Sequence, residues 1–243
     1  MMKYLIGNFK MNKTFFEVES YIEALSYLIE KNADKLKNIK IGIAPSFDST
    51  HLSYMHPNRN FLFGLQNIYH ELNGAYTGEV SLNVAIAADI DFILIGHSER
   101  RSLFNETNEL INKKIAHLEK TKITPILCVG ESLEEFNNRE TFLVLEKQIK
   151  SALANIEDNK NLIISYEPVY CIGNGIIPEA SHIKKVVDFI HCLLDNEIPV
   201  LYGGSVSLNN IEILEQVKNL SGYLVGGASL NAAKFVDLAL KIK

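Results

Sequence analysis

The sequence predicts an α/β fold, a single (β/α)8 barrel in which residues 1–243 form one domain. Eight short apolar runs recur along the chain, and stretches with helical spacing separate most of them. The 243 residues contain no Pro/Ser-rich linker and no break in composition, which favours one large domain over two small ones. A doubly wound open sheet is the alternative. Against it, no Gly-x-Gly-x-x-Gly motif follows the first apolar run.

The eight apolar runs have the length of β-strands and are apolar on both faces, as buried parallel strands are. They predict strands at residues 4–6, 39–44, 61–65, 92–95, 123–129, 162–165, 199–202 and 223–225.

Three of the intervening stretches have an apolar face with helical spacing. The predicted faces are Phe15, Val18, Ile22, Leu25 and Ile29 in the first, Ile183, Val186, Val187, Ile190 and Leu194 in the second, and Ala233, Val236 and Leu240 in the third. Thr14 and Glu17 have the spacing of a capping box, so the first of these helices is expected to begin beside them.

Charge and composition argue against several kinds of partner. The net charge is −5, with 24 Lys and Arg against 29 Asp and Glu, and the absence of a long basic run predicts no nucleic-acid partner and no membrane surface. No stretch approaches the ~18 apolar residues that span a bilayer, and the N-terminus lacks the long apolar segment of a signal peptide. A small anionic ligand is still compatible, because backbone N–H groups at a helix start bind anions without adding to the net charge.

Cysteine usage points to a reducing compartment. Cys128, Cys171 and Cys192 are odd in number, lie far apart and have no metal-ligand spacing. They predict neither a disulfide framework nor a zinc site, and they indicate a cytoplasmic protein. The aromatic residues comprise ten Tyr, twelve Phe and no Trp.

Unusual polar residues and glycines follow the predicted strands. They are residues 8–10, 96–101, 166–168, 203–205 and 226–229. In (β/α)8 barrels the functional site lies where strands run into the loops that follow them, so function is expected at this end of the barrel.

Glu167, His97 and Lys10 are the candidate reactive groups. Glu167 lies between an apolar strand and Pro168, where partial desolvation makes a carboxylate a better base. The alternative is a carboxylate that faces water or pairs with Arg100.

His97 precedes a polar string able to open a helical turn, whose N-terminus disfavours the imidazolium form. A neutral ring there could exchange protons with a substrate oxygen, and the alternative is a histidine satisfied by backbone groups. Lys10 places positive charge where negative charge could develop, unless it is a surface lysine.

Two glycine turns and one apolar loop predict an anion site with a cover. The turns at residues 203–205 and 226–229 follow the seventh and eighth strands, where barrels commonly bind phosphate through backbone N–H groups. Residues 168–178 form a loop that is rich in apolar residues and bounded by prolines. We expect a lid that closes over the ligand and brings the N–H of Gly173 close to a phosphate. The alternative is a loop that packs permanently on the rim of the barrel.

These motifs resemble those of the triosephosphate isomerase family, and the match extends over nearly the whole chain. The matching segments are residues 7–12, 96–101, 166–169, 202–206 and 224–230. The resemblance implies a TIM barrel enzyme that interconverts the triose phosphates dihydroxyacetone phosphate and D-glyceraldehyde 3-phosphate by proton transfer through an enediolate. It implies no metal and no organic cofactor. Two other classes remain open: a catalytically inactive phosphosugar-binding barrel, and a sugar-phosphate epimerase, whose usual metal ligands at strand ends are not found in the sequence.

The resemblance also implies roles for individual residues. Glu167 is the base that moves a proton between two carbons, His97 is the neutral electrophile, and Lys10 stabilises the enediolate. Glu99 organises the site beside Lys10 and His97, and Ser98 holds Glu167 while the lid is open. The substrate-binding residues are Asn8, Lys10, Gly173, Ser205, Gly226 and Gly227.

Residues 74–80 resemble the loop through which members of the family dimerise. The resemblance implies a homodimer in which Thr77 reaches the active site of the other subunit near Asn8.

Several positions depart from the usual pattern of the family. Trp is common at Phe9 and Tyr170, Ala at Cys171, Gly at Asn105 and Asp at Ser221. None of these changes removes a proposed catalytic group. Because Cys171 lies at the first hinge of the lid, we hypothesise that its modification impairs turnover more than that of the other two thiols. The alternative is that Cys171 only fills space.

Overall fold

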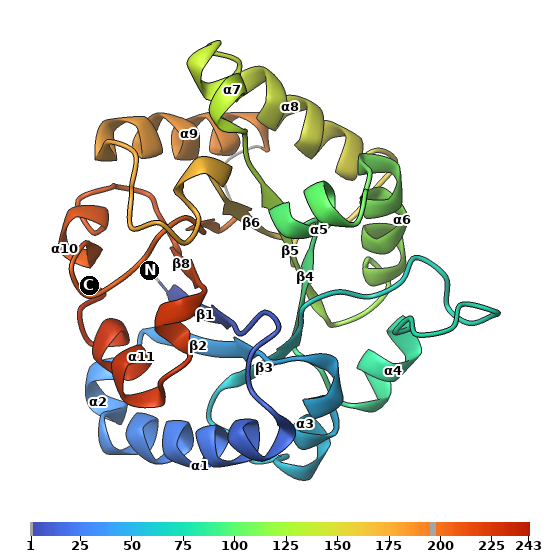
Figure 1. Cartoon of the computed structure of the whole chain (residues 1–243), viewed down its shortest axis with the longest axis vertical. Helices are drawn as coiled ribbons and strands as arrows, with labels where there is room; N and C mark the ends of the chain where they lie inside the picture. The colour runs from blue at the N-terminus through green and yellow to red at the C-terminus, as the bar shows by residue number, and fades with distance from the viewer. Residues whose placement is uncertain (1, 195–197) are drawn as a thin grey trace.

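The computed structural model of the chain describes residues 2–194 and 198–243, so residues 1 and 195–197 of the predicted domain lie outside the described part. Eight strands pair in parallel in chain order, and the last pairs with the first, so the sheet closes into a barrel (Figure 1). This closure confirms the predicted (β/α)8 class, and the open doubly wound alternative is wrong.

Each predicted strand is present: β2 and β4 have their predicted bounds, and the ends of the others differ by at most two residues. The strands are β1 (Lys3–Asn8), β2 (Ile39–Ala44), β3 (Leu62–Leu65), β4 (Phe92–Ile95), β5 (Thr124–Val129), β6 (Ile163–Tyr166), β7 (Val200–Tyr202) and β8 (Gly222–Val225). Strand β1 runs two residues past its predicted end, because Gly7 and Asn8 continue the ladder opposite Ile43 and Ala44.

Helices surround the barrel on its outside (Figure 1). In the described residues they are α1 (Phe15–Lys31), α2 (Ala33–Leu36), α3 (His51–Met55), α4 (Leu82–Ala87), α5 (Ser98–Leu103), α6 (Asn108–Leu118), α7 (Leu133–Asn137), α8 (Thr141–Ala152), α9 (Ala180–Leu193), α10 (Ile211–Leu214) and α11 (Ala232–Ala239). Short 3-10 turns are η1 (Phe47–Ser49), η2 (Val169–Cys171) and η3 (Gly227–Ser229). No helix in these ranges is long and apolar enough to cross a membrane.

Helix α1 begins where its capping pair predicts. Oε2 of Glu17 accepts hydrogen bonds from the backbone N–H and the hydroxyl of Thr14, at 2.7 and 2.9 Å. The predicted apolar face of α1 is confirmed, with its central residues Val18, Ile22 and Leu25 buried. The face predicted for α9 is also confirmed, with Ile183, Val186, Val187 and Ile190 buried and Leu194 in the C-cap position.

The predicted buried face of α11 is wrong in two of its three residues. Val236 is buried, but Ala233 and Leu240 are exposed. The helix turns Phe235 inward instead, because a large aromatic side chain removes far more apolar surface from water than an alanine does. Leu240 lies beyond the last helical residue and is the C-cap.

Side chains fill the inside of the barrel, so it contains no channel along its axis. They come from alternate positions of the strands: Ile6, Ala44, Phe92, Leu94, Ile126, Cys128, Ile163, Leu201 and Leu224. Gly64 makes room for the ring of Phe92, since a Cβ atom at position 64 would lie 2.3 Å from the ring. A ligand therefore has space only at an end of the barrel.

Candidate active site

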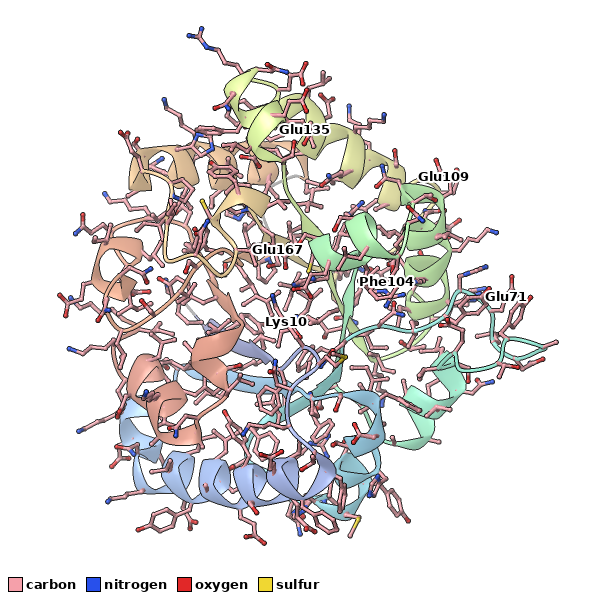
Figure 2. All side chains as sticks on the ribbon, viewed as in Figure 1. Lys10, Glu71, Phe104, Glu109, Glu135 and Glu167 are labelled. Carbon is pink, nitrogen blue, oxygen red and sulfur yellow. The ribbon has the colours of Figure 1, made fainter. Side chains whose placement is uncertain are left out.

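A cavity of about 260 Å³ lies at the carboxyl ends of the strands. The predicted residues that line it are Asn8, Lys10, His97, Glu167, Gly173, Ser205, Gly226 and Gly227. In Figure 2, Lys10 and Glu167 lie near the barrel axis, whereas Glu71 lies at the outer edge. The fold therefore gathers residues that are up to 219 positions apart in the sequence, from 8 to 227, around one space.

Lys10 is held in a strained backbone conformation at the end of β1. Its φ of 51° lies in the left-handed region that non-glycine residues rarely adopt. Three side chains hold this turn in place: Asn8 Oδ1 accepts from the Lys10 N–H at 3.0 Å, and Gln66 Nε2 donates to the Lys10 carbonyl at 2.9 Å. The third is Glu99, whose Oε1 lies 2.6 Å from Lys10 Nζ.

The hydrogen bonds of His97 define which ring nitrogen carries the proton. His97 caps the N-terminus of α5, and its Nδ1 accepts a hydrogen bond from the backbone N–H of Glu99 at 3.2 Å. An acceptor nitrogen has a free lone pair, so in this geometry the ring proton lies on Nε2. Nε2 lies 3.8 Å from Glu167 Oε1. In this arrangement the ring presents an N–H to the cavity, and the role of His97 as a neutral electrophile stays a prediction.

Glu167 is almost fully buried, with 1% of its surface exposed. Its Oε2 accepts a hydrogen bond from the backbone N–H of Ser98 at 3.3 Å, whereas Oε1 has no hydrogen-bond partner among the described residues. A buried carboxylate oxygen without a partner is rare and costly. The alternative that Glu167 pairs with Arg100 is wrong, because Arg100 Nε donates to Glu106 at 2.5 Å.

The second glycine turn, residues 226–229, leaves the backbone open to the cavity. A Cβ atom at Gly227 would meet no heavy atom of the described residues within 4 Å. Gly226 lies close to Lys10, whose Cε would be 3.5 Å from a Cβ atom built on it. The Ser229 hydroxyl donates to the Gly226 carbonyl at 2.7 Å and Tyr21 donates to the Ser229 carbonyl at 2.7 Å, which fixes the second turn. Open N–H groups beside a lysine suit an anion.

The lid segment is exposed in its middle and buried at its ends. Gly173 and Gly175 have positive φ angles of 75° and 80°. Ile176, in the same segment, is 58% exposed. Cys171 is buried at the first hinge. The loop thus combines an exposed middle with buried ends, and its closure over a ligand stays a prediction.

Thr77 lies far from this cavity, in the loop between β3 and α4. This loop projects away from the barrel at the right of Figure 1. Thr77, within the loop, is exposed. Thr77 contributes nothing to the cavity lined by its own chain.

Gln66 and Gly130 contribute to the site although the sequence did not single them out for it. Gln66 Nε2 donates to the carbonyls of both Lys10 and Ala44, at 2.9 and 3.0 Å, and so joins β1 to β2 beside the reactive lysine. Gly130 follows β5 and lies against the backbone of Glu167. Its place directly after a strand was the signal that could have identified it. Gln66 follows β3 directly and carried the same signal, although its contact with Lys10 spans 56 positions.

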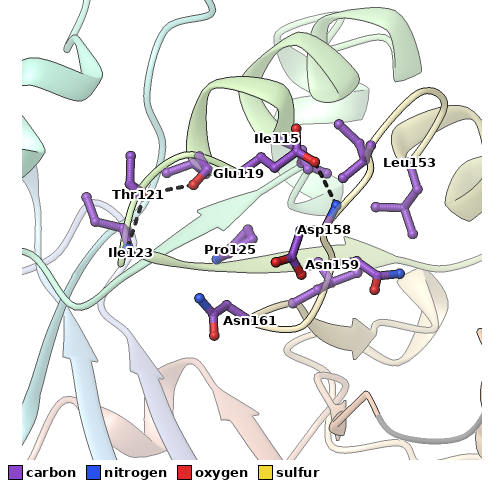
Figure 3. A pocket seen from close by; sticks show the side chains of 12 residues that line it. Ile115, Glu119, Thr121, Ile123, Pro125, Leu153, Asp158, Asn159 and Asn161 are labelled. Atoms are coloured by element: carbon purple, nitrogen blue, oxygen red, sulfur yellow. Dashed lines mark hydrogen bonds between the residues drawn. The ribbon is translucent and has the colours of Figure 1, made fainter.

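Another cavity, of about 40 Å³, lies at the opposite end of the barrel (Figure 3). Glu119 at its edge accepts hydrogen bonds from the backbone N–H groups of Glu157 and Asp158, at 2.6 and 2.7 Å. Its volume holds about one water molecule. Within the described ranges as a whole, no group of three or more His, Cys, Asp or Glu side chains could hold a metal ion.

Comparison with known proteins gives one consistent result. The protein-family model described as "Triosephosphate isomerase" matches residues 3–242. Three similar relatives, each named "Triosephosphate isomerase", come from Mycoplasmopsis pulmonis (38% identical over 237 residues, 96% of this chain and 95% of the relative), Mycoplasma mobile (36% over 237, 97% and 98%) and Synechocystis sp. (37% over 240, 98% and 98%).

Proposed function

The chain belongs to the triosephosphate isomerase family and is an isomerase of triose phosphates, and on that premise we propose that Glu167, His97 and Lys10 carry its proton transfer. One observation supports this assignment above the others. The partnerless Oε1 of Glu167 and the Nε2 of His97 lie 3.8 Å apart on the wall of one cavity.

The proposed reaction needs one base and one acid. Glu167 removes the proton from the carbon next to the carbonyl group, and His97 gives its Nε2 proton to the carbonyl oxygen, which forms the enediolate intermediate. His97 then takes a proton back from the hydroxyl oxygen on the carbon that lost its proton, and Glu167 gives its proton to the former carbonyl carbon. These two transfers form the other triose phosphate and restore both residues. A carboxylate base beside a neutral histidine is the pattern established for the family. Lys10 stabilises the negative charge that develops on the oxygens.

The remaining residues hold the substrate and the reactive groups. Backbone N–H groups of Gly173, Ser205, Gly226 and Gly227 bind the phosphate, and Asn8 helps to place the substrate. Binding of the phosphate favours closure of the lid, which excludes water and protects the enediolate from loss of phosphate. Ser98 holds Glu167 through its N–H before closure, and Glu99 aligns Lys10 and His97.

We also propose that the chain works as a homodimer, with Thr77 reaching the site of the second subunit. Support comes from the projecting loop and from exposed apolar side chains on it, on α4 and at the end of α5. These side chains are Leu72, Tyr76, Val84, Ile86, Leu103 and Phe104. Sedimentation of the chain, and of a variant without residues 74–78, tests the proposal: the first should be a dimer and the second a monomer. Three free thiols are consistent with a cytoplasmic location and a place in glycolysis, and residues 1–243 act as one catalytic domain.

The roles of the site residues are tested by a coupled assay of the wild type and Glu167→Gln side by side. Loss of the base is expected to lower kcat by at least about 10³-fold. Binding of a phosphate-bearing enediolate mimic, measured by calorimetry, is expected to persist, because the glycine turns are unchanged. Near wild-type turnover in Glu167→Gln would show that another group moves the proton.

A further inference from the structure

The backbone of Glu167 is held by the segment that follows β5. The Glu167 N–H donates to the Val129 carbonyl at 2.7 Å, and the Val169 N–H donates to the Glu131 carbonyl at 3.0 Å. Hydrogen bonding between these two segments of the chain thus continues past the ends of β5 and β6. The position of Glu167 therefore depends on where residues 129–131 lie.

Gly130, in the middle of that segment, is in direct contact with Glu167. A Cβ atom at position 130 would lie 1.8 Å from the Glu167 carbonyl oxygen and 3.3 Å from its Cα. No side chain fits there, so the two backbones touch with no compressible group between them. A shift of Gly130 is consequently passed on to Glu167.

Gly130 is held in turn by a side chain of helix α8. Oε1 of Gln148 accepts a hydrogen bond from the Gly130 N–H at 2.9 Å, and Nε2 of Gln148 donates to the Gly130 carbonyl at 3.0 Å. One amide group therefore binds both polar groups of the glycine. Loss of either hydrogen bond leaves a backbone polar group of Gly130 to be solvated anew.

A cavity lies beside Gly130, so the two hydrogen bonds from Gln148 are important for holding this glycine in place. A cavity of about 260 Å³ lies on the side of Glu167 away from the substrate site, and Gln148, Gly130, Val129 and Val169 line it. Packing therefore does little to keep Gly130 in place on this side. Gln148 is absent from the lining of the substrate cavity.

We propose that Gln148 is a positioning residue for the proton transfer: it fixes Gly130 and thereby places the carboxylate of Glu167. The inference rests on the role proposed for Glu167 above. Because Gln148 lies away from the phosphate turns, its loss slows the chemical step and leaves substrate binding unchanged. A displacement of about 1 Å in a reacting group costs up to 10²-fold in rate.

Two substitutions test the proposal. Gln148→Met removes both hydrogen bonds at similar volume, and kcat is expected to fall about tenfold with KM unchanged within twofold. Gln148→Glu keeps the acceptor for the Gly130 N–H but cannot donate to the Gly130 carbonyl while it is ionised. When protonated, it presents one donor and one acceptor, as the amide does. The ratio of its kcat to that of the wild type is therefore expected to rise as the pH falls.

The same ratio for Gln148→Met should not change with pH. The titratable side chains of Arg101, Cys128, Glu135 and Glu167 also line this cavity. They are present in both variants, so their own titration affects both ratios alike. The matched control is Asn112→Leu. Nδ2 of Asn112 also donates to two backbone carbonyls, those of Ala152 and Ala154, at 3.0 and 2.9 Å, away from the site. It should lower thermal stability and leave kcat within twofold of the wild type.

The proposal is overturned if Gln148→Met keeps wild-type kcat, or if Gln148→Glu shows no recovery in acid. It is also overturned if Asn112→Leu lowers kcat as much, since the effect would then follow stability alone. Glu167→Gln, assayed beside these variants, distinguishes failure of the Gln148 inference from failure of the roles proposed for the site residues. An inactive Glu167→Gln with an active Gln148→Met removes only this inference, whereas an active Glu167→Gln removes the proposed roles of the site as well.

Discussion

Nε2 of His97 lies 3.8 Å from Oε1 of Glu167, and the two atoms come from the ends of β4 and β6, which are not neighbours in the barrel. Two hydrogen bonds at the N-terminus of α5 keep this pair in place. The Ser98 N–H binds the carboxylate, and the Glu99 N–H binds Nδ1 of the ring. A single helix start therefore orients both the base and the acid of the proposed reaction.

Gly203→Ala is expected to lower kcat at least tenfold, because the new methyl group would lie 2.7 Å from Cγ of Glu167 and 2.5 Å from Oγ of Ser165. Overpacking of this kind costs about 1–3 kcal/mol and moves the carboxylate. Gly227→Ala is the matched substitution, since its methyl group meets nothing within 4 Å in the described structure. It should raise KM by intruding on the phosphate site. Steady-state kinetics separate the two, and equal effects on kcat and KM in both variants would contradict the prediction.

Gln66→Met should raise KM and lower kcat several-fold. The substitution removes the hydrogen bonds to the Lys10 and Ala44 carbonyls, so the left-handed backbone of Lys10, which costs about 1–3 kcal/mol, loses its support. Gln216→Met, at an exposed glutamine, is the control and should behave as the wild type. If both variants retain wild-type kinetics, Lys10 is held by other contacts.

Glu106→Gln should destabilise the folded chain by about 3 kcal/mol at neutral pH, because it leaves the buried Lys114 and the partly exposed Arg100 without a counter-charge. Glu106 lies 3.0 Å from Lys114 Nζ and 2.5 Å from Arg100 Nε, and both Glu106 and Lys114 are buried. Glu146→Gln removes an exposed pair with Lys150 and should cost less than about 1 kcal/mol.

The stability difference at Glu106 should also depend on pH. Burial alone raises the pKa of this carboxyl, but the charges and hydrogen bonds of Lys114 and Arg100 outweigh burial and hold the pKa below its ordinary value. A carboxyl with a lowered pKa stabilises the fold above its ordinary titration range and ceases to do so as the pH falls through the lowered value. Denaturant unfolding should therefore show the gap between wild type and Glu106→Gln narrowing below about pH 4. A gap that stays constant down to pH 3 would refute the ion-pair explanation.

Alkylation should reach Cys192 first and leave turnover intact. Cys192 is exposed, whereas Cys171 and Cys128 are buried. Burial raises the pKa of the Cys171 thiol to about 11 and that of Cys128 well above its ordinary value, so both are poor nucleophiles at neutral pH. Peptide mapping after brief iodoacetamide treatment checks this, with Cys192→Ser as the unlabelled control. The hypothesis that modification at Cys171 impairs turnover stays a prediction, and it needs conditions that open the hinge.

Most of the fold was predictable from the sequence because buried parallel strands are uniformly apolar and stand out from their surroundings. The buried face of α11 was predicted wrongly because the spacing of Ala233 and Leu240 was followed, although the larger Phe235 has more apolar surface to bury. Residues at strand ends, such as His97 and Glu167, were predictable as a group because the barrel brings those ends together. Gln66, directly after β3, belongs to the same group. Gln148 was not predictable, since it lies within a helix and acts on the backbone of a distant segment, and a glutamine carries no mark of such a contact.

One departure from the family pattern has a clear physical reason in the structure. Asn105, at a position where Gly is common in the family, has a φ of 53°. Glycine adopts this conformation freely, and asparagine is among the residues that tolerate it best. The substitution therefore keeps the turn between α5 and α6.

The ring of Tyr170 at the first hinge of the lid lies 4.8 Å from that of Phe136, and the Tyr170 carbonyl accepts a hydrogen bond from Asn174 in the lid at 2.7 Å. Since the sequence contains no tryptophan, light at a wavelength that excites only indole produces no fluorescence from the protein. A Tyr170→Trp substitution would introduce a single indole fluorophore between the ring of Phe136 and the proposed lid. A change in its emission on addition of ligand would report the proposed closure, a measurement that a tryptophan-rich relative would obscure.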